Sequence, residues 1–177
     1  MSWVGASMKR TVLEAERLWL SALSIDELLS IQTDEADVLD MPIEAEVLSG
    51  IVKSAIQKKI AKMQSVGPAL HDWYTYWLIV SKKTGHGIGF IGFKGIDETG
   101  YAEVGYSIAP DYRRQGLMTE ALEAMIGWAR QVPNVKGITA TKVLQTNTGS
   151  NKVLRHCGFI QTDSSDTENA YCYQFRE

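Results

Sequence analysis

The sequence predicts an α/β (α+β) fold, with a central mixed, mostly antiparallel sheet flanked by helices. Strand-like segments joined by turn signals fill residues 77–108, and helical and strand-like segments then alternate. The chain has 177 residues, of which 45% are hydrophobic and 22% charged, enough for one domain with its own core. Without an internal repeat or low-complexity linker, residues 1–177 are expected to form a single domain, with 1–10 as a frayed end.

The first elements predicted are a short strand and a helix. Residues 18–22 form an apolar run typical of a strand. Ser24 is followed three residues later by Glu27, which is the spacing of a capping box. A helix should therefore begin near Ile25. The acidic stretch 34–46 then predicts a loop.

A second helix is predicted after Pro42, which is common near helix starts. From Glu44 to Met63 apolar residues recur about every four positions and form one apolar stripe that includes Ile51. The lysines of this segment are expected to lie largely off the stripe, on a solvated face rather than a binding patch: Lys53, Lys58, Lys59 and Lys62.

Three strands are predicted next, at 77–80, 88–93 and 101–108, with a turn between the first two. Residues of a strand alternate between its two faces, so Glu103 shares a face with Tyr101, Gly105 and Ser107. The carboxylate lies in an otherwise apolar strand, and it requires either a partner or a function. The rest of the chain predicts a helix over 116–131, a strand over 138–143, a short helix over 150–157 ended by Gly158, and closing strands at 159–161 and 171–175.

The segment 108–121 is the best candidate for a binding site. A strand ends, a basic turn containing Gly116 follows, and a helix begins, which would direct unpaired backbone N–H groups and the positive helix end at an anion such as phosphate. A plain loop-to-helix junction explains the same composition equally well. A Walker-type loop is excluded, because Lys and Ser/Thr do not follow Gly116.

The pattern Arg113-x-x-Gly116-x-Met118 resembles the R/Q-x-x-G-x-G/A signature that binds the pyrophosphate of acetyl-CoA in GNAT acetyltransferases. Thr119-Glu120-Ala121-Leu122 is similar to the T-E-A-L of the RimJ/RimL branch, which acetylates protein N-termini. Three further stretches agree with that branch in order and spacing: Trp77-Leu78-Ile79-Val80 through Ile88-Gly89, Glu103-Val104-Gly105-Tyr106, and Asn147-x-x-Ser150-x-Lys152-Val153 ending at Gly158-Phe159. The resemblance covers residues 77–159, with a fainter match at 16–18.

The resemblance implies the GNAT fold, in which the sheet splays after the strand that carries Glu103. A bulge there would free the backbone of Tyr106 and Ile108 to pair with the pantetheine arm. It further implies transfer of the acetyl group of acetyl-CoA to a primary amine in a ternary complex. The expected acceptor is a protein or peptide N-terminal α-amine. Acetylation of a small amine such as a polyamine, amino sugar or antibiotic is the alternative, as is a non-catalytic acyl-CoA-binding module.

The site residues also follow from this resemblance. Those expected to bind the cofactor are Tyr106, Ser107, Ile108, Arg113, Arg114, Gln115, Gly116, Leu117, Met118, Thr119, Asn147 and Lys152. Glu103 is the expected general base, unless it only pairs with a lysine or arginine within the sheet. Ser150 is the expected proton donor, although it could also be a helix N-cap. A backbone N–H near Ile108 would stabilise the oxyanion. The tyrosine that many GNAT enzymes use as general acid would fall at Leu154.

Other partners are not expected. A net charge of −3 disfavours nucleic acid, and no apolar run is long enough for a membrane span. The N-terminus lacks a signal peptide, and the two cysteines are expected to be reduced, so we expect a cytoplasmic monomer or homodimer. The three histidines lie far apart, which predicts no metal site. The acidic stretches 34–46 and 163–168 would suit a cationic acceptor, and the aromatic cluster 71–77 would form core or wall the acceptor pocket.

Overall fold

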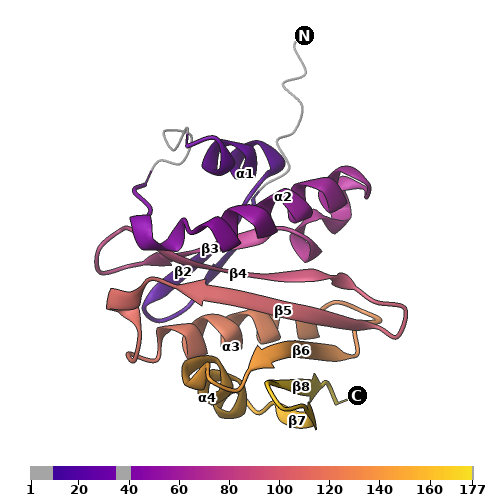
Figure 1. The fold of residues 1–177 in the computed structure, drawn as a ribbon. Coiled ribbons are helices and arrows are strands. Elements are labelled where there is room, and N and C mark those ends of the chain that lie inside the picture. Colours follow the sequence, from indigo (N-terminus) through magenta and orange to yellow (C-terminus); the bar gives the residue numbers. More distant parts are fainter. Residues whose placement is uncertain (1–9, 35–40, 177) are drawn as a thin grey trace.

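The computed structural model describes residues 10–34 and 41–176, and within them an eight-stranded sheet forms the centre of the protein (Figure 1). Its strands in spatial order are β1 (Val12–Glu14), β2 (Leu18–Ala22), β3 (Tyr76–Ser81), β4 (Gly87–Ile96), β5 (Tyr101–Ile108), β6 (Gly137–Leu144), β8 (Glu168–Gln174) and β7 (Ile160–Ser164). Neighbours are antiparallel except for β5 and β6, which run parallel. The predicted mixed, mostly antiparallel sheet is confirmed. Residues 1–9 of the frayed end predicted at 1–10, and the loop residues 35–40, lie outside the described residues, whereas Arg10 is described and pairs with Glu27.

Helices cover both faces of this sheet. Helices α1 (Ile25–Gln32) and α2 (Gly50–Gln64) lie on one face, and α3 (Leu117–Arg130) and α4 (Thr148–His156) lie on the other (Figure 1). Short 3-10 turns, η2 (Ala45–Val47), η3 (Pro68–Trp73) and η4 (Pro110–Tyr112), connect these elements. Each face therefore has its own apolar cluster, one beneath α1 and α2 and the other beneath α3.

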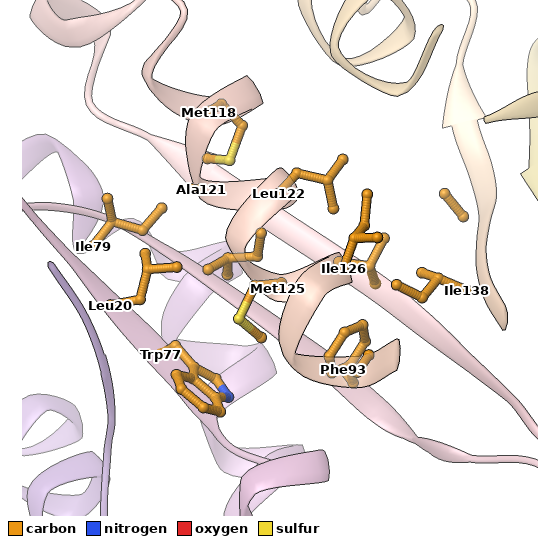
Figure 2. Packing of buried hydrophobic residues seen from close by; sticks show 14 of the residues in the cluster. Leu20, Trp77, Ile79, Phe93, Met118, Ala121, Leu122, Met125, Ile126 and Ile138 are labelled. Carbon is orange, nitrogen blue, oxygen red and sulfur yellow. The ribbon is translucent and has the colours of Figure 1, made fainter. Parts of the chain in front are cut away.

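The larger cluster is built around α3. Figure 2 shows the α3 side chains gathered among Leu20, Trp77 and Phe93 of the sheet, which are fully buried. The helix buries the apolar positions that its periodicity predicted, so the predicted boundaries near 116 and 131 are confirmed to within a residue. Trp128 extends the cluster, with its ring 4.5 Å from that of Trp73. This packing fixes the N-terminus of α3, where the candidate anion site lies.

Helix α2 differs from the prediction in two ways. It begins at Gly50 rather than Glu44, because Ser49 accepts a hydrogen bond from the amide of Val52 and caps it there. The apolar stripe is also rotated. Ile51 is 84% exposed, whereas Lys59 is buried with 7% exposure. The prediction that Lys59 lies on the solvated face was wrong.

Lys59 is buried because its ammonium group has backbone partners. Its Nζ donates to the carbonyl oxygens of Phe93 at 2.9 Å and Tyr74 at 3.2 Å, and lies 4.5 Å from the centre of the Tyr76 ring. Burial and the neighbouring charges of Lys94 and Lys62 lower the pKa of Lys59 to about 7. The buried lysine thus joins α2 to strand β4 across the first face of the sheet.

The sheet opens between β5 and β6. These strands pair only over residues 101–103 of β5, and beyond Glu103 they separate. The irregularities lie on the neighbouring strands, between Phe93 and Ile96 of β4 and between Ala140 and Val143 of β6. The expected splay is present, but the extra residues belong to β4 and β6 instead of the strand that carries Glu103. One edge of β5 is consequently unpaired over its last five residues.

Candidate active site

The open edge of β5 presents unpaired backbone groups. The amide of Ala109 donates to Ile88 of β4 at 2.8 Å. Because backbone groups of a strand alternate in direction, the amides and carbonyls of Tyr106 and Ile108 point the other way, to the side that β6 has left. The carbonyl of Ile108 accepts a hydrogen bond from Arg113 Nε at 3.3 Å. This edge can accept an extended ligand as an added strand.

A second group of backbone donors lies at the start of α3. Gly116 is the N-cap residue, has φ of 76°, and makes no side-chain cap. The first amides of the helix therefore lack a side-chain partner at the cap, and they lie at its positive end. Arg113, Arg114 and Gln115 are exposed in the loop before it, whereas the side chains of Leu117 and Met118 are in the core. This loop can receive an anionic ligand through its backbone and its two arginines.

Arg17, for which the sequence predicted no role, holds this loop in place. Its Nη1 donates to the Gln115 carbonyl at 2.8 Å, and its Nε and backbone amide donate to the Glu120 carboxylate at 2.9 and 2.8 Å. The guanidinium thus offsets the charge of Glu120 beside the anion site. The only sequence signal was the faint family match at 16–18, because the partners are about one hundred residues away.

Glu103 lies where the two strands separate, between a lysine and a threonine. Lys94 Nζ of β4 is 3.2 Å from its Oε2, and the hydroxyl of Thr141 on β6 donates to its Oε1. Burial raises the pKa of Glu103, but the Thr141 hydrogen bond and the Lys94 charge outweigh burial, and the pKa lies below its usual value. The lysine partner considered as an alternative is thus present. The carboxylate is still 27% exposed and ionised at neutral pH, so it can accept a proton.

Two clefts meet beside Glu103 on the α2 face of the sheet. The first, of about 470 Å³, runs along α2 and is lined by Gly50, Ile51, Ser54, Ala55, Lys58, Lys59, Lys62, Tyr74, Tyr76, Lys94 and Gly105. The second, of about 380 Å³, contains Glu103 and Thr141 and shares Lys62 and Lys94 with the first. The clefts are therefore adjacent, and the carboxylate of Glu103 lines the second.

The aromatic cluster 71–77 lines the first cleft in part, whereas the acidic stretches do not. Trp73 and Trp77 are buried in the core, while Tyr74 and Tyr76 line the first cleft, so the cluster contributes to both. The described residues of the acidic stretches 34–46 and 163–168 line neither cleft. Three of the lysines that were expected to form only a solvated face, Lys58, Lys59 and Lys62, line the first cleft.

The N-terminus of α4 lies next to the open edge of β5. Asn147 Oδ1 accepts from the amide of Ser150 at 3.1 Å, so Asn147 is the N-cap, and the interpretation of Ser150 as the cap was wrong. The Tyr106 hydroxyl donates to the Ser150 carbonyl at 3.2 Å, and burial raises the pKa of Tyr106. The Ser150 hydroxyl lies close enough to the Tyr106 hydroxyl to lower the pKa of Tyr106, against the effect of burial, and it is not the cap of α4. It is thus available to a ligand.

A buried polar network holds this helix start. Asn151 is 5% exposed and donates to the carbonyls of Leu144 and Asn147 at 3.0 and 2.7 Å. Its Oδ1 accepts from Asn169 at 2.9 Å and from the Tyr171 hydroxyl at 2.5 Å. Sequence reasoning missed Asn151, since an asparagine in a helix gives no sign of partners on a later strand.

The other candidates differ in their surroundings. Lys152 is exposed on α4, and Leu154 is fully buried. Cys157 Sγ lies 3.7 Å from the Thr119 carbonyl, and burial together with Glu123 raises the pKa of Cys157 to about 12, so it is a neutral thiol. Among the residues that the structure describes, no three His, Cys, Asp or Glu side chains gather as metal ligands. Nor is any described helix long and apolar enough to cross a membrane.

Known proteins are similar to this chain in sequence. Residues 17–160 match the family described as Acetyltransferase (GNAT) domain. An uncharacterized N-acetyltransferase of Bacillus subtilis (strain 168), YjdG, is 36% identical over 98 residues, which cover 55% of this chain and 58% of that protein. The p20 N-acetyltransferase of Bacillus licheniformis, also uncharacterized, is 37% identical over 82 residues, 46% of each chain. The chain therefore spans about half the length of these curated relatives.

Solved structures share the fold over nearly the whole chain. The ribosomal-protein-S5-alanine acetyltransferase of Vibrio fischeri has a TM-score of 0.66 at 17% identity, covering 93% of this chain and 96% of that one. RimL, a ribosomal L7/L12 α-N-protein acetyltransferase solved with coenzyme A, has a TM-score of 0.65 at 15% identity, covering 93% and 98%. Together with the family match over 144 residues, about four fifths of the sequence, these findings show that the chain belongs to the GNAT acetyltransferase family.

Proposed function

We propose that the chain is an acetyl-CoA-dependent N-acetyltransferase whose acceptor is the N-terminal α-amine of a protein or peptide. The observation that carries this proposal is the position of Glu103. Its ionised carboxylate lies between the open edge of β5 and the cleft along α2. A base at that boundary can reach an amine delivered from the cleft while a thioester is held along the strand edge.

The residues present fit acetyl-CoA, which would supply an acetyl group activated as a thioester. The first amides of α3, from Gly116 to Thr119, would bind the pyrophosphate together with Arg113 and Arg114. The left-handed conformation of Gly116 and the missing side-chain cap leave this helix end open to an anion.

The pantetheine arm would pair with the exposed backbone of Tyr106 and Ile108, next to Ser107 and Asn147. The weak 3.3 Å contact from Arg113 to Ile108 would give way to that pairing. Lys152 would approach a phosphate from the exposed side of α4.

Three groups of this chain would then assist the chemistry. Glu103 takes the proton of the acceptor ammonium, directly or through one water, and Lys94 and Thr141 hold its carboxylate in place. A backbone N–H near Ile108 stabilises the developing negative charge on oxygen. Ser150, whose hydroxyl lies beside that of Tyr106 at the open edge of β5, donates a proton to the leaving thiolate.

The acceptor is proposed to be a polypeptide for two reasons. Two proteins of the same fold are named for acetylation of ribosomal proteins. The cleft is also long, because it extends along α2 from Gly50 to Lys62. Tyr74 and Tyr76 in its wall favour a second candidate, a compact small amine.

The acceptor is tested by release of free CoA thiol from acetyl-CoA with a panel of amines. The panel sets peptides that begin with Ser or Ala beside polyamines, amino sugars and aminoglycosides. We expect release with peptides and the mass of the product to place the acetyl group on the α-amine. Release with small amines alone would contradict the peptide acceptor, and silence throughout would indicate a binding module.

Glu103→Gln tests the base. We expect kcat to fall about 10² to 10⁴-fold, the usual contribution of general base catalysis, with acetyl-CoA affinity retained. Because the pKa of Glu103 lies below its ordinary value of 4.5, the wild type stays ionised from pH 6 to 9 and the loss should persist across that range. Glu123→Gln, an exposed glutamate on α3, is the matched control. Unchanged kcat in Glu103→Gln would rule out Glu103 as the base.

Ser150→Ala and Asn147→Ala separate chemistry from capping. Ser150→Ala should lower kcat at least several-fold with little change in the melting temperature, because Asn147 and not the Ser150 hydroxyl caps the helix. Asn147→Ala removes the cap and should reduce the free energy of unfolding by about 1 kcal/mol. Thermal unfolding and steady-state kinetics of both variants decide the matter; a stability loss in Ser150→Ala without a kinetic effect would contradict the proton-donor role.

Gly116→Val tests the anion site. A β-branched residue is strained at φ of 76°, and its side chain would cover the helix end, so we expect acetyl-CoA affinity to fall about tenfold or more. Gly127→Ala on the same helix adds a side chain in open space and should leave affinity unchanged. Calorimetric titration with acetyl-CoA measures both. Equal affinities in the two variants would refute the assignment.

A further inference from the structure

We infer that the acceptor is an acidic peptide, in which carboxylate side chains follow closely after the N-terminal residue. This inference rests on the proposed function, N-terminal acetylation, and adds the charge of the acceptor. It contradicts the expectation of a cationic acceptor, which depended on acidic stretches that do not line the site in their described parts.

The shape of the cleft fits an extended segment. Ile51, Ala55, Lys58 and Lys62 share one face of α2, since they follow one another at four-, three- and four-residue steps, and Ser54 adjoins that face. From Gly50 to Lys62 a helix rises about 18 Å, at about 1.5 Å per residue. An extended peptide covers that length with five or six residues, at about 3.3 Å each. The cleft can thus contact the first few side chains of an acceptor whose amine lies near Glu103.

The charge of the cleft is strongly positive. Lysines are its charged lining residues: Lys58, Lys59, Lys62 and Lys94. Glu103 at the boundary offsets only one of them, through Lys94. Asp97, whose carboxylate accepts hydrogen bonds from the amides of Thr99 and Tyr101 and stays ionised, lines the second cleft and not the first. Lys58 and Lys62 are exposed, one helical turn apart, and form no ion pair with any described residue. Carboxylates of a bound peptide are the complementary partners for this pair.

Lys59 indicates that the positive charges are crowded. Burial and the charges of Lys94 and Lys62 bring its pKa down to about 7. These three lysines therefore already interact unfavourably, and a bound anion would relieve that repulsion. A cationic ligand in the same cleft would increase it.

The choice of amine also follows from the charges of the site. Next to Glu103 the charges of Lys62 and Lys94 are balanced by those of Glu103 and Asp97, so the ordinary pKa of the amine determines how readily it becomes neutral. An α-amine, with an ordinary pKa of about 7.7 to 8.0, is more easily deprotonated than a lysine side chain near 10.4. Polyamines and aminoglycosides, which carry several positive charges, are repelled. An acidic peptide combines attraction for its carboxylates with an amine that is readily deprotonated.

Three hexapeptides with the same N-terminal serine test this inference, with acidic, amide or lysine side chains at positions two to four. We expect kcat/KM for the acidic peptide to exceed that for the amide peptide about tenfold at low salt, and the lysine peptide to be poorest. The differences in kcat/KM among the three peptides should become smaller as ionic strength rises, because salt screens the charges. In Lys58→Gln/Lys62→Gln the ratio of acidic to amide peptide should fall toward one.

Lys53→Gln is the matched control. Lys53 lies on α2 but pairs with Asp34 at 2.7 Å and does not line the cleft, so the ratio should stay as in the wild type. Turnover of all three peptides without an acidic preference would overturn this inference and leave N-terminal acetylation standing. A preference that survives the double substitution would overturn it as well. No turnover of any peptide by protein that binds acetyl-CoA would overturn the proposed function, and the inference with it.

Discussion

The site depends on the separation of β5 from β6 after three paired residues. In a continuous sheet the last residues of β5 would donate and accept along both edges, and no ligand could pair with them. Here the bulges of β4 and β6 bend the neighbouring strands, and one edge of β5 remains open. Glu103 is the last paired residue, so its carboxylate lies where the opening begins. The loop before α3 lies along the same edge, because Arg113 donates to the Ile108 carbonyl. The start of α4 lies there as well, because the Tyr106 hydroxyl donates to the Ser150 carbonyl.

Lys59 contributes a second constraint on the same region. A charged group buried between a helix and a sheet is costly unless its hydrogen bonds are made, and Lys59 makes two to backbone carbonyls. These bonds tie α2 to β4 beside the β4 bulge. The wall of the cleft and the opening of the sheet are thus joined by one side chain. Its buried charge also adds to the positive field along α2.

The helices and strands were predicted from local sequence patterns. These predictions were close for helix α3 and for the strand that carries Glu103, where burial follows the periodicity of the sequence, and for the capping box at Ser24, where the spacing of two residues is sufficient. The prediction failed for Lys59 and Ile51, because a buried lysine that bonds to backbone is indistinguishable in sequence from a solvated one. Ser150 was considered as an alternative N-cap, but the cap is Asn147, since both residue types suit that position. The contacts of Arg17 and Asn151 could not be predicted, because their partners lie far along the chain, and only a faint family match at 16–18 pointed to Arg17.

The network around Asn151 has a consequence for the order in which the chain folds. Every residue of the family motifs lies before position 160, yet the start of α4 is held by Asn169 and Tyr171 of strand β8. A nascent chain that has emerged only as far as Phe159 therefore contains the whole motif set without the polar contacts that hold the start of α4. Those contacts form only when β8 takes its place between β6 and β7. The motif segment thus depends on a later strand for the position of Ser150.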